Sequence, residues 1–258
     1  MDTGLSGKKV IVFGGASGIG QAVVRAFRSE EAEVFVADLE PGDETSSAKV
    51  DISDLAEVTT VVNQIGDKQG GIDHVVCAAA KGSGKFGFPF WNLEPGDWKS
   101  VLEVSLIGSV NVAHACQPWL CEGGNDGKTL LYFTSVAGQI GSQTDPPYSA
   151  AKAGVINFTQ CAAKDFAAYG VRVNALSPGM VKTDLNESVW ASSQQGIPEE
   201  NRLSYEDWAD LKIKSIAPLA RWQEPEEFGA MAVYLASFHA KNITGQIINI
   251  DGGQVMKG

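Results

Sequence analysis

A tyrosine and a lysine four positions apart, in Tyr148-Ser149-Ala150-Ala151-Lys152, are the side chains of this sequence best suited to move a proton. On a helix, positions i and i+4 lie on one face, so the ammonium group can sit close to the phenol. A phenol with a pKa of about 10 is a poor base at neutral pH until nearby positive charge favours the phenolate. The pattern by itself is common, so its position matters more. Ser135 ends an apolar run 13 residues before Tyr148 and adds a hydroxyl to the set.

A glycine-rich segment, Gly14-Gly15-Ala16-Ser17-Gly18-Ile19-Gly20, lies between the apolar run 10–13 and an amphipathic stretch. Glycines at such a place let the backbone approach a pyrophosphate, while the following helix directs its first N–H groups at the negative charge. The spacing is G-x-x-x-G-x-G and not the general G-x-G-x-x-G, and turns also need glycine. The position between a predicted strand and a predicted helix therefore carries the interpretation as a dinucleotide site.

A carboxylate, Asp38, closes the next apolar run 18 residues after Gly20. A carboxylate there can accept hydrogen bonds from the adenosine ribose hydroxyls and would repel the extra phosphate of NADP. Neither Ser17 nor Leu39 supplies a cation for that phosphate. The alternative is a surface aspartate that only closes a strand. We expect the cofactor to be NAD.

The composition indicates a globular chain with an acidic balance. The 258 residues are 44% hydrophobic and 20% charged, with a formal net charge of −11. One domain spanning residues 1–258 is the economical expectation at this length. An acidic balance argues against nucleic acid or an acidic membrane surface as a partner, because both need a basic face. The sequence has no run of 18 apolar residues and no signal-peptide pattern, so we expect a cytoplasmic protein with no membrane span.

The cysteines and histidines predict no metal site. The four cysteines contain no C-x-x-C pair, and His74, His114 and His239 do not complete a zinc pattern, so we expect reduced thiols. The stretch from Lys81 to Lys85 resembles a P-loop only superficially, because Phe86 follows the lysine where Ser or Thr is needed.

Short apolar runs alternate with longer amphipathic ones, which is the order of strand–helix–strand units in a parallel sheet. We therefore predict an α/β fold, a doubly wound parallel sheet of the Rossmann type, whose buried strands need not alternate polar and apolar residues. The predicted strands are 10–13, 34–37, 74–78, 130–133, 171–176 and 246–250, and the predicted helices are 19–30, 95–121, 148–169 and 225–237.

The stretch 183–216 interrupts this alternation, because it is polar and offers no clear strand. A loop this long inside a compact domain is usually functional, so we expect a substrate lid there. The helix expected after Tyr148 is rich in alanine. Small residues on several of its faces fit either a subunit interface or burial within one subunit.

Taken together, these motifs resemble the short-chain dehydrogenase/reductase family, and the likeness runs from about Gly7 to Gly253. The shared features are the glycine loop, Asp38, Asp51-Ile52, Ser135, Tyr148-x-x-x-Lys152, Pro178-Gly179 with Thr183, Thr244-Gly245-Gln246 and Asp251-Gly252-Gly253. They occur in the order and at the spacing of the family.

The resemblance implies a role for each matching residue. Tyr148 would be the general acid/base as hydride moves between an alcohol carbon and the nicotinamide. Lys152 would lower the phenol pKa and hold the nicotinamide ribose, and Ser135 would hydrogen-bond the substrate oxygen. Residues implied at the cofactor are Gly14, Ser17, Gly18, Ile19, Gly20, Asp38, Leu39, Asp51, Ile52, Ala78, Ala79, Ala80, Tyr148, Lys152, Pro178, Gly179, Val181 and Thr183. The family also suggests a homotetramer built on the long helices that start near Pro95 and Tyr148.

Three departures from the family pattern bear on activity. Phe13 stands where the family usually has Thr, and Cys77-Ala78-Ala79-Ala80 replaces its Asn-Asn-Ala-Gly. Ser105 aligns with the fourth catalytic residue, an Asn thought to hold a relay water; Ser has a shorter arm but still donates and accepts. We expect an NAD-dependent enzyme interconverting a secondary alcohol and its ketone. The alternative is a catalytically impaired NAD-binding regulatory or scaffold protein.

The substrate is the least determined feature, and its expected surroundings are residues 86–91, 139–148 and 186–190. Phe86, Phe88, Phe90 and Trp91 fit either an apolar wall of the site or a subunit contact. No basic cluster marks a phosphate or carboxylate, although Lys85 and Lys182 are nearby candidates. A cyclic alcohol, a polyol and a hydroxy-lipid all remain open.

Overall fold

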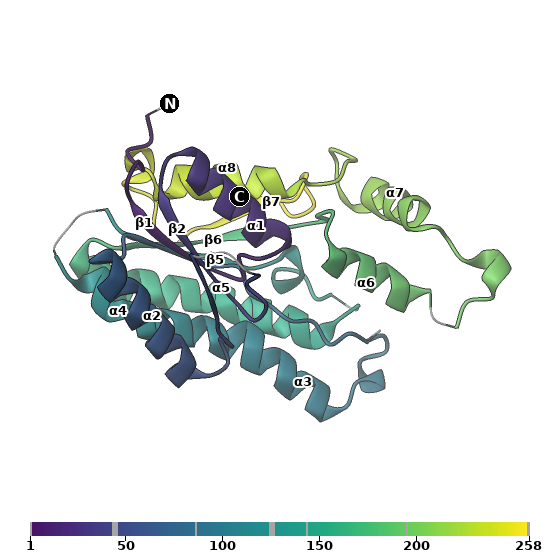
Figure 1. The fold of residues 1–258 in the computed structure, drawn as a ribbon. Coiled ribbons are helices and arrows are strands. Elements are labelled where there is room, and N and C mark those ends of the chain that lie inside the picture. The colour runs from purple at the N-terminus through teal and green to yellow at the C-terminus, as the bar shows by residue number, and fades with distance from the viewer. Residues whose placement is uncertain are drawn as a thin grey trace.

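Seven strands form one parallel sheet in the computed structural model, in the order β3-β2-β1-β4-β5-β6-β7 (Figure 1). The structure describes residues 2–42, 46–85, 87–123, 127–142, 144–194 and 196–256, apart from the side chains of Asp184 and Leu185. The strands are β1 Lys9–Phe13, β2 Glu33–Asp38, β3 Ser47–Lys49, β4 His74–Cys77, β5 Thr129–Phe133, β6 Arg172–Pro178 and β7 Ile247–Ile250.

Helices cover both faces of this sheet, as the predicted fold class requires (Figure 1). Successive side chains of a strand point to opposite faces. In β1, Ile11 and Phe13 belong to the cluster packed under α2, α4 and α5, while Val10 and Val12 belong to the cluster under α1 and α8. The helices are α1 Gly18–Ser29, α2 Leu55–Gln69, α3 Pro95–Leu102, α4 Gly108–Cys121, α5 Pro146–Phe166, α6 Asp184–Ser193, α7 Tyr205–Ile216 and α8 Pro225–Ala236.

The order in which strands are added to the sheet switches sides at β1, which pairs with β2 on one side and with β4 on the other. The chain leaves β1 toward β2 and β3 and then returns to build β4, β5, β6 and β7 on the opposite side. In open α/β sheets, ligands bind beyond the carboxyl ends of the strands at such a switch point. The fold therefore places the functional site at the ends of β1, β4, β5 and β6.

The structure differs from the predicted elements in three places. The single helix predicted over 95–121 is divided into α3 and α4 by a π-helical turn, Glu103–Ile107. The predicted loop 183–216 contains α6 and α7. Strand β3 and helix α2 were not among the predicted elements. None of the helices in the described residues is both long and apolar enough to cross a bilayer.

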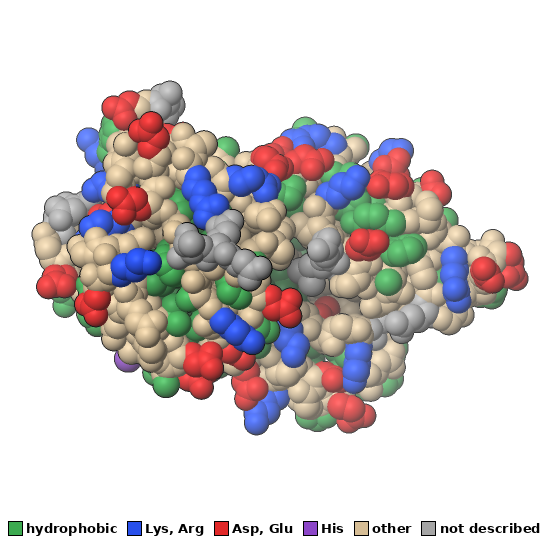
Figure 2. Space-filling view, in the orientation of Figure 1, with side chains coloured by type: hydrophobic (Ala, Val, Ile, Leu, Met, Phe, Trp, Pro, Cys, Tyr) green, Lys and Arg blue, Asp and Glu red, His purple; other side chains and the backbone are tan. Residues whose placement is uncertain are grey.

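The visible surface carries both signs of charge. Figure 2 shows Asp and Glu side chains interspersed with Lys and Arg across this face, over the helices as well as over the loops. The arrangement agrees with a chain whose acidic residues outnumber its basic ones, 31 to 20.

Candidate active site

The start of α5 places Tyr148 and Lys152 on one helix face. Asp145 caps the helix and its Oδ1 accepts a hydrogen bond from the Tyr148 backbone N–H at 3.5 Å. Pro146 occupies the first turn, where a missing N–H costs nothing because that turn has no intrahelical acceptor. The side chain of Ser149 donates to the backbone carbonyl of Ala137 and ties this turn to the segment after β5. The cap and this tie thus hold the side chains of Tyr148 and Lys152, at i and i+4, next to each other.

Lys152 is buried, with 2% of the residue exposed, and its ammonium lies at the carboxyl end of β5. Its Nζ donates a hydrogen bond of 2.6 Å to the backbone carbonyl of Phe133 and lies 5.5 Å from the centre of the Tyr148 ring. Burial lowers the pKa of Lys152 from 10.5 to about 8. The group therefore remains a cation at neutral pH, but one that is costly to keep away from water.

The surroundings of Tyr148 favour the protonated form of its phenol. The pKa of this phenol is raised to about 12, mainly by burial and also by the negative charge of Asp145, while a hydrogen bond with the Ser135 side chain acts in the opposite direction. The pKa of Lys152, about 8, lies below that of Tyr148, about 12, so the lysine has lost its charge before the phenol titrates in the protein alone. At neutral pH its ammonium lies 5.5 Å from the centre of the ring, close enough to favour the phenolate.

Ser135 presents its hydroxyl to the same place because it follows directly after β5. Its Oγ accepts a hydrogen bond from the Ala137 backbone N–H at 3.1 Å. The neighbouring Thr134 hydroxyl donates to the backbone carbonyl of Leu176 at 3.0 Å and so holds β5 against β6. Of these two adjacent hydroxyls, Thr134 is engaged by the sheet and Ser135 faces the tyrosine.

Ser135, Tyr148 and Lys152 line one cavity of about 320 Å³. Side chains between the sheet and α6 and α7, among them Ile140, make much of its wall apolar. The cavity also collects seven of the residues expected at the cofactor, namely Ile19, Ala78, Ala80, Pro178, Gly179, Val181 and Thr183. The structure thus brings the predicted proton-transfer group and the predicted nicotinamide end together.

The glycine loop forms a close cradle beside this cavity. Gly14 has φ +76°, and a Cβ built there would lie 2.5 Å from the Ala79 backbone nitrogen. A Cβ at Gly20 would lie 1.9 Å from the Gly14 carbonyl oxygen. In the described residues, the Ser17 side chain forms no capping bond and the first turn of α1 holds no acid. Its N–H groups are therefore available to an anion such as a pyrophosphate, and the chain fits a dinucleotide here.

The carboxylate of Asp38 holds this loop at the end of β2. Its Oδ2 accepts a hydrogen bond from the Ala16 backbone N–H at 3.0 Å, and its Oδ1 accepts one from Glu40 at 3.1 Å. Both oxygens keep lone pairs, since a carboxylate accepts more than one bond per oxygen. Asp38 is therefore more than the last residue of a strand.

Comparison with known proteins agrees with this geometry. A family profile described as enoyl-(acyl carrier protein) reductase matches residues 14–254, which contain the glycine loop, Ser135, Tyr148 and Lys152. A 3-oxoacyl-[acyl-carrier-protein] reductase of Thermotoga maritima is 31% identical over 98% of this chain and 99% of its own. The chain belongs to the short-chain dehydrogenase/reductase family.

Other members of the family act on varied alcohols by their names. A galactitol 2-dehydrogenase of Agrobacterium fabrum is 30% identical over 98% of this chain and 99% of its own. A cis-4-hydroxycyclohexanecarboxylate dehydrogenase of Sinomonas cyclohexanicum is 30% identical over 94% of both chains. The ligand-free aldohexose dehydrogenase of Thermoplasma acidophilum shares the fold, with a TM-score of 0.88, 24% identity and coverage of 99% of this chain and 97% of its own. The chain is an oxidoreductase of a family that uses a nicotinamide cofactor.

Ser105, which departs from the family pattern, lies in the π-helical turn and does not line the cavity among its described residues. Its Oγ accepts a hydrogen bond from the Lys81 backbone N–H and donates one to the Lys81 carbonyl, both at 2.9 Å. Ser105 thus fixes the segment after β4, including Ala78 and Ala80, by binding both backbone groups of one residue.

Two of the other departures, Phe13 and Cys77, are buried side chains without charge. Phe13 is fully buried in the cluster between the sheet and α2. Burial raises the pKa of the Cys77 thiol to about 11, so the group stays neutral at physiological pH. Both residues pack the centre of the sheet beneath the cofactor crevice.

Asp51 and Ile52, expected at the adenine end, lie away from the cavity but are held by α4. The Asn111 side chain donates to the Ile52 carbonyl at 2.9 Å. A Cβ at Gly108 would lie 2.7 Å from the Ile52 side chain, so α4 approaches this segment closely. Leu39 is exposed beyond Asp38.

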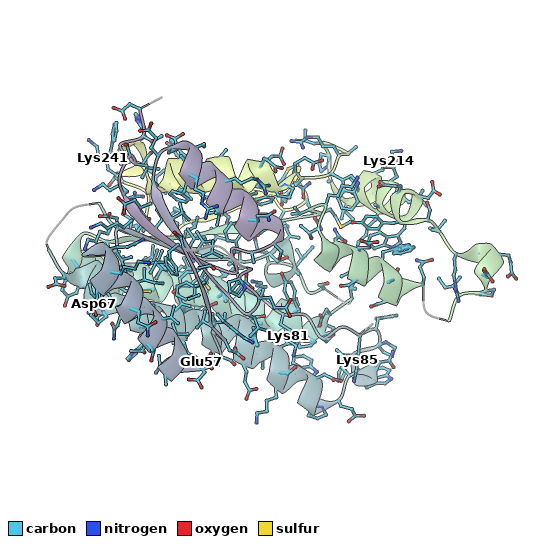
Figure 3. All side chains as sticks on the ribbon, in the orientation of Figure 1. Glu57, Asp67, Lys81, Lys85, Lys214 and Lys241 are labelled. Atoms are coloured by element: carbon cyan, nitrogen blue, oxygen red, sulfur yellow. The ribbon has the colours of Figure 1, made fainter. Side chains whose placement is uncertain are left out.

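The side chains expected around the substrate divide into those that reach the cavity and those that do not. Phe88, Phe90 and Trp91 are exposed and do not border it, while Phe86 lies outside the described residues. Both candidate cations are paired, Lys85 with Asp97 at 2.8 Å and Lys182 with Glu206 at 3.2 Å, and Lys85 lies beside the start of α3 (Figure 3).

Two charged residues that the sequence analysis did not single out also border the cavity. Asp145 and Lys212 both contribute to its wall. Asp145 had a local signal, since an aspartate before two prolines is typical of a helix start. Lys212 had none, because it lies in the segment interpreted as a loop.

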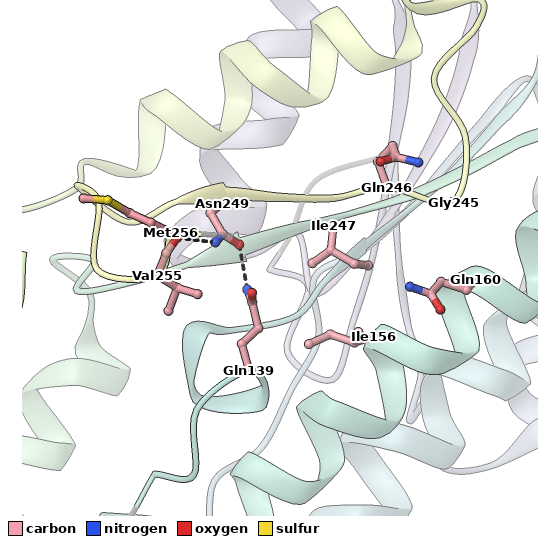
Figure 4. A pocket seen from close by; sticks show the side chains of 9 residues that line it. All are labelled: Gln139, Ile156, Gln160, Gly245, Gln246, Ile247, Asn249, Val255 and Met256. Carbon is pink, nitrogen blue, oxygen red and sulfur yellow. Dashed lines mark hydrogen bonds between the residues drawn. The ribbon is translucent and has the colours of Figure 1, made fainter. Parts of the chain in front are cut away.

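A second cavity of about 670 Å³ lies between α5 and β7 and contains none of the proton-transfer residues. Gln139 and Asn249 line it and are joined by a hydrogen bond of 2.6 Å, and Asn249 donates to the Val255 carbonyl at 2.9 Å (Figure 4). Gln139 also donates to Ser177 on β6. The polar residues of this cavity thus brace the C-terminal segment against the sheet.

Proposed function

We propose that this chain is an NAD-dependent dehydrogenase that interconverts a secondary alcohol and its ketone. The observation that carries the proposal is the cavity in which Ser135, Tyr148 and Lys152 meet residues that follow β1, β4 and β6. A protonated phenol, a second hydroxyl and a buried ammonium beside a dinucleotide cradle are the groups that carbonyl reduction and its reverse require.

In this proposal Tyr148 carries the proton. A nicotinamide bound beside these residues would supply the hydride acceptor for oxidation of the alcohol and the hydride donor for reduction of the ketone. In oxidation the Tyr148 phenolate takes the hydroxyl proton as the C–H bond breaks, and in reduction the phenol gives a proton to the oxygen. Ser135 donates a hydrogen bond to that oxygen where negative charge develops. Lys152 binds the cofactor ribose and holds positive charge near the phenol.

In this proposal the cofactor contacts come from three regions of the chain. Gly14, Ser17, Gly18, Ile19 and Gly20 would form the pyrophosphate cradle, and Asp38 would accept bonds from the adenosine ribose. Residues assigned to the adenine and nicotinamide ends are Leu39, Asp51, Ile52, Ala78, Ala79, Ala80, Pro178, Gly179, Val181 and Thr183.

Titration with NADH and NADPH, followed by energy transfer from the six tryptophans, tests the cofactor preference. Because Asp38 repels a 2′-phosphate, we expect NADPH to bind at least about tenfold more weakly, roughly 1.4 kcal/mol. Equal or tighter NADPH binding would overturn the NAD assignment. In that case Lys49, which pairs with Asp38 across β2 and β3, would be the candidate cation for the 2′-phosphate, and its replacement would be the next variant to make.

Replacement Tyr148→Phe tests the acid/base assignment. It removes the hydroxyl and keeps the ring, so we expect NADH binding to remain and turnover of secondary alcohols to fall about 10²- to 10⁴-fold. Undiminished hydride transfer would contradict the role of Tyr148. A wild-type protein that binds NADH but oxidises no alcohol would support the regulatory or scaffold alternative.

We also propose that the protein works as a cytoplasmic homotetramer through α4 and α5. The alanines of α5 were expected either at a subunit interface or buried within one subunit, and both kinds occur. Ala151, Ala162 and Ala163 are buried within the subunit, while Ala150 and Ala153 are exposed. Small exposed residues permit a second helix to approach closely. Light scattering during gel filtration measures the assembly.

A further inference from the structure

We propose that Lys212 binds a carboxylate on the substrate, so that this chain acts on a small hydroxy or keto acid. The inference rests on the proposed dehydrogenase function and names its substrate class. Three features carry it: the position of Lys212 in the cavity wall, the absence of an acidic partner for it among the described residues, and the apolar residues that line the same cavity.

Helix α7 fixes the place of Lys212. Ala209 and Ile213, on the buried side of α7, pack against Met180, which itself lines the cavity. The Ser204 hydroxyl caps the start of the helix by accepting from the Asp207 backbone N–H. Lys212 lies next to Ile213 in this anchored helix and borders the same cavity as Tyr148.

The charge of Lys212 is not neutralised within the described residues. The other lysine of this helix, Lys214, pairs with Asp210 at 3.2 Å, and Lys182 pairs with Glu206. For Lys212, the described contact is the Trp208 ring, whose centre lies 4.6 Å from Nζ. Lys212 is half-buried, and this burial lowers the pKa of its ammonium. The ring face leaves its N–H donors free to bind an anion.

The described charged side chains around the cavity favour a single negative charge on the ligand. They are Asp145, Lys152 and Lys212. Lys152 is engaged by the Phe133 carbonyl beside Tyr148. Asp145 adds negative charge at the Tyr148 end of the cavity. It therefore repels a dianion such as a phosphate monoester more strongly than it repels a carboxylate. A carboxylate at Lys212 compensates a cation that is otherwise partly desolvated.

Part of the cavity wall fits a hydrocarbon body. Ile140, Met180, Val189 and Ile216 line the cavity that Lys212 shares with Ser135, Tyr148 and Lys152. An open-chain polyol would bring hydroxyl groups against this surface without partners, which is unfavourable. The expected substrate therefore has a secondary alcohol or ketone at one end, a compact apolar middle, and a carboxylate at the other.

The test compares two substrates of the same shape, 4-hydroxycyclohexanecarboxylate and 4-hydroxycyclohexanecarboxamide, with NAD. For the wild-type enzyme we expect kcat/KM to be at least about tenfold higher for the acid than for the amide. In Lys212→Met this ratio should fall toward one, and Lys212→Arg should restore part of it. Lys214→Met, a change of the same charge on the same helix, is the control and should leave the ratio as it is (Figure 3).

Binding supplies a readout that does not depend on turnover. Cyclohexanecarboxylate, which has no hydroxyl to oxidise, should quench tryptophan fluorescence of the enzyme–NADH complex and bind at least about tenfold more weakly to Lys212→Met. Equal binding of the acid and its amide by the wild-type protein, no binding of either, or tighter binding of cyclohexyl phosphate would overturn the inference. Turnover of neutral alcohols with no preference for the acid would contradict the inference about Lys212 and leave the proposed dehydrogenase function in place. Lys212-dependent binding of the acid without turnover of any alcohol would support the inference and count against the proposed dehydrogenase.

Discussion

At the scale of single residues, Asp145 and Ser135 act on the Tyr148 phenol in opposite directions. Asp145 raises its pKa and Ser135 lowers it. In alcohol oxidation the phenolate is the active form, so kcat/KM should rise with pH through the pKa of Tyr148. Replacement Asp145→Asn removes the repelling charge and keeps an oxygen for the helix cap. We expect the pH profile to move to lower pH by about 0.5 to 1 unit.

The matched control is Asp165→Asn, which removes the same charge at the exposed far end of α5. It should leave the midpoint of the profile in place. An unchanged midpoint in Asp145→Asn, or a move to higher pH, would show that Asp145 does not influence the phenol in the working enzyme. Initial rates with one alcohol and saturating NAD measure the effect.

At the scale of elements, the turn between β1 and α1 depends on a backbone position that admits no side chain. In Gly14→Ala a Cβ would lie 2.5 Å from the Ala79 nitrogen, and the residue has φ +76°. We expect NADH affinity to fall at least about tenfold, because β1 and the segment after β4 must separate. Gly42→Ala is the control, with φ +73° and nothing within 4 Å. It should cost about 1 kcal/mol of stability and leave NADH affinity unchanged.

Local sequence patterns predict some of these elements and the residues they position, but not others. Ser135, Tyr148 and Lys152 were predictable because strand ends and the spacing i, i+4 are local properties. The π-helical turn Glu103–Ile107 was not, because five residues leave no separate period in the hydrophobic pattern. Helices α6 and α7 were also missed, since their stabilising contacts come from aromatic packing such as Tyr205 on Trp222, with ring centres 5.6 Å apart.

At the scale of the whole molecule, the fold class was predictable and the contents of the cavity only in part. Apolar runs and amphipathic stretches in alternation predict a doubly wound parallel sheet, which the structure confirms. Lys212 reaches the cavity because Ala209 and Ile213 of α7 pack with Met180, which is far from them in the sequence, and no local pattern predicts this contact. The position of Lys212 in the cavity was therefore beyond the sequence, whereas the meeting of Ser135, Tyr148 and Lys152 in one cavity was within it.

The stability of the whole molecule should also record the cost of burying Lys152. Its pKa falls from 10.5 to about 8 on folding, so below about pH 8 the unfolded chain holds the proton more tightly and folding is opposed. That difference corresponds to about 3 kcal/mol, partly offset by the bond to Phe133. Lys152→Met should therefore abolish turnover yet unfold at a higher temperature at neutral pH. The advantage should shrink as the pH rises from about 8 to 10.5, because the wild-type amine becomes neutral in both states. Calorimetry across this range measures it, and a variant less stable at neutral pH would contradict the charge argument.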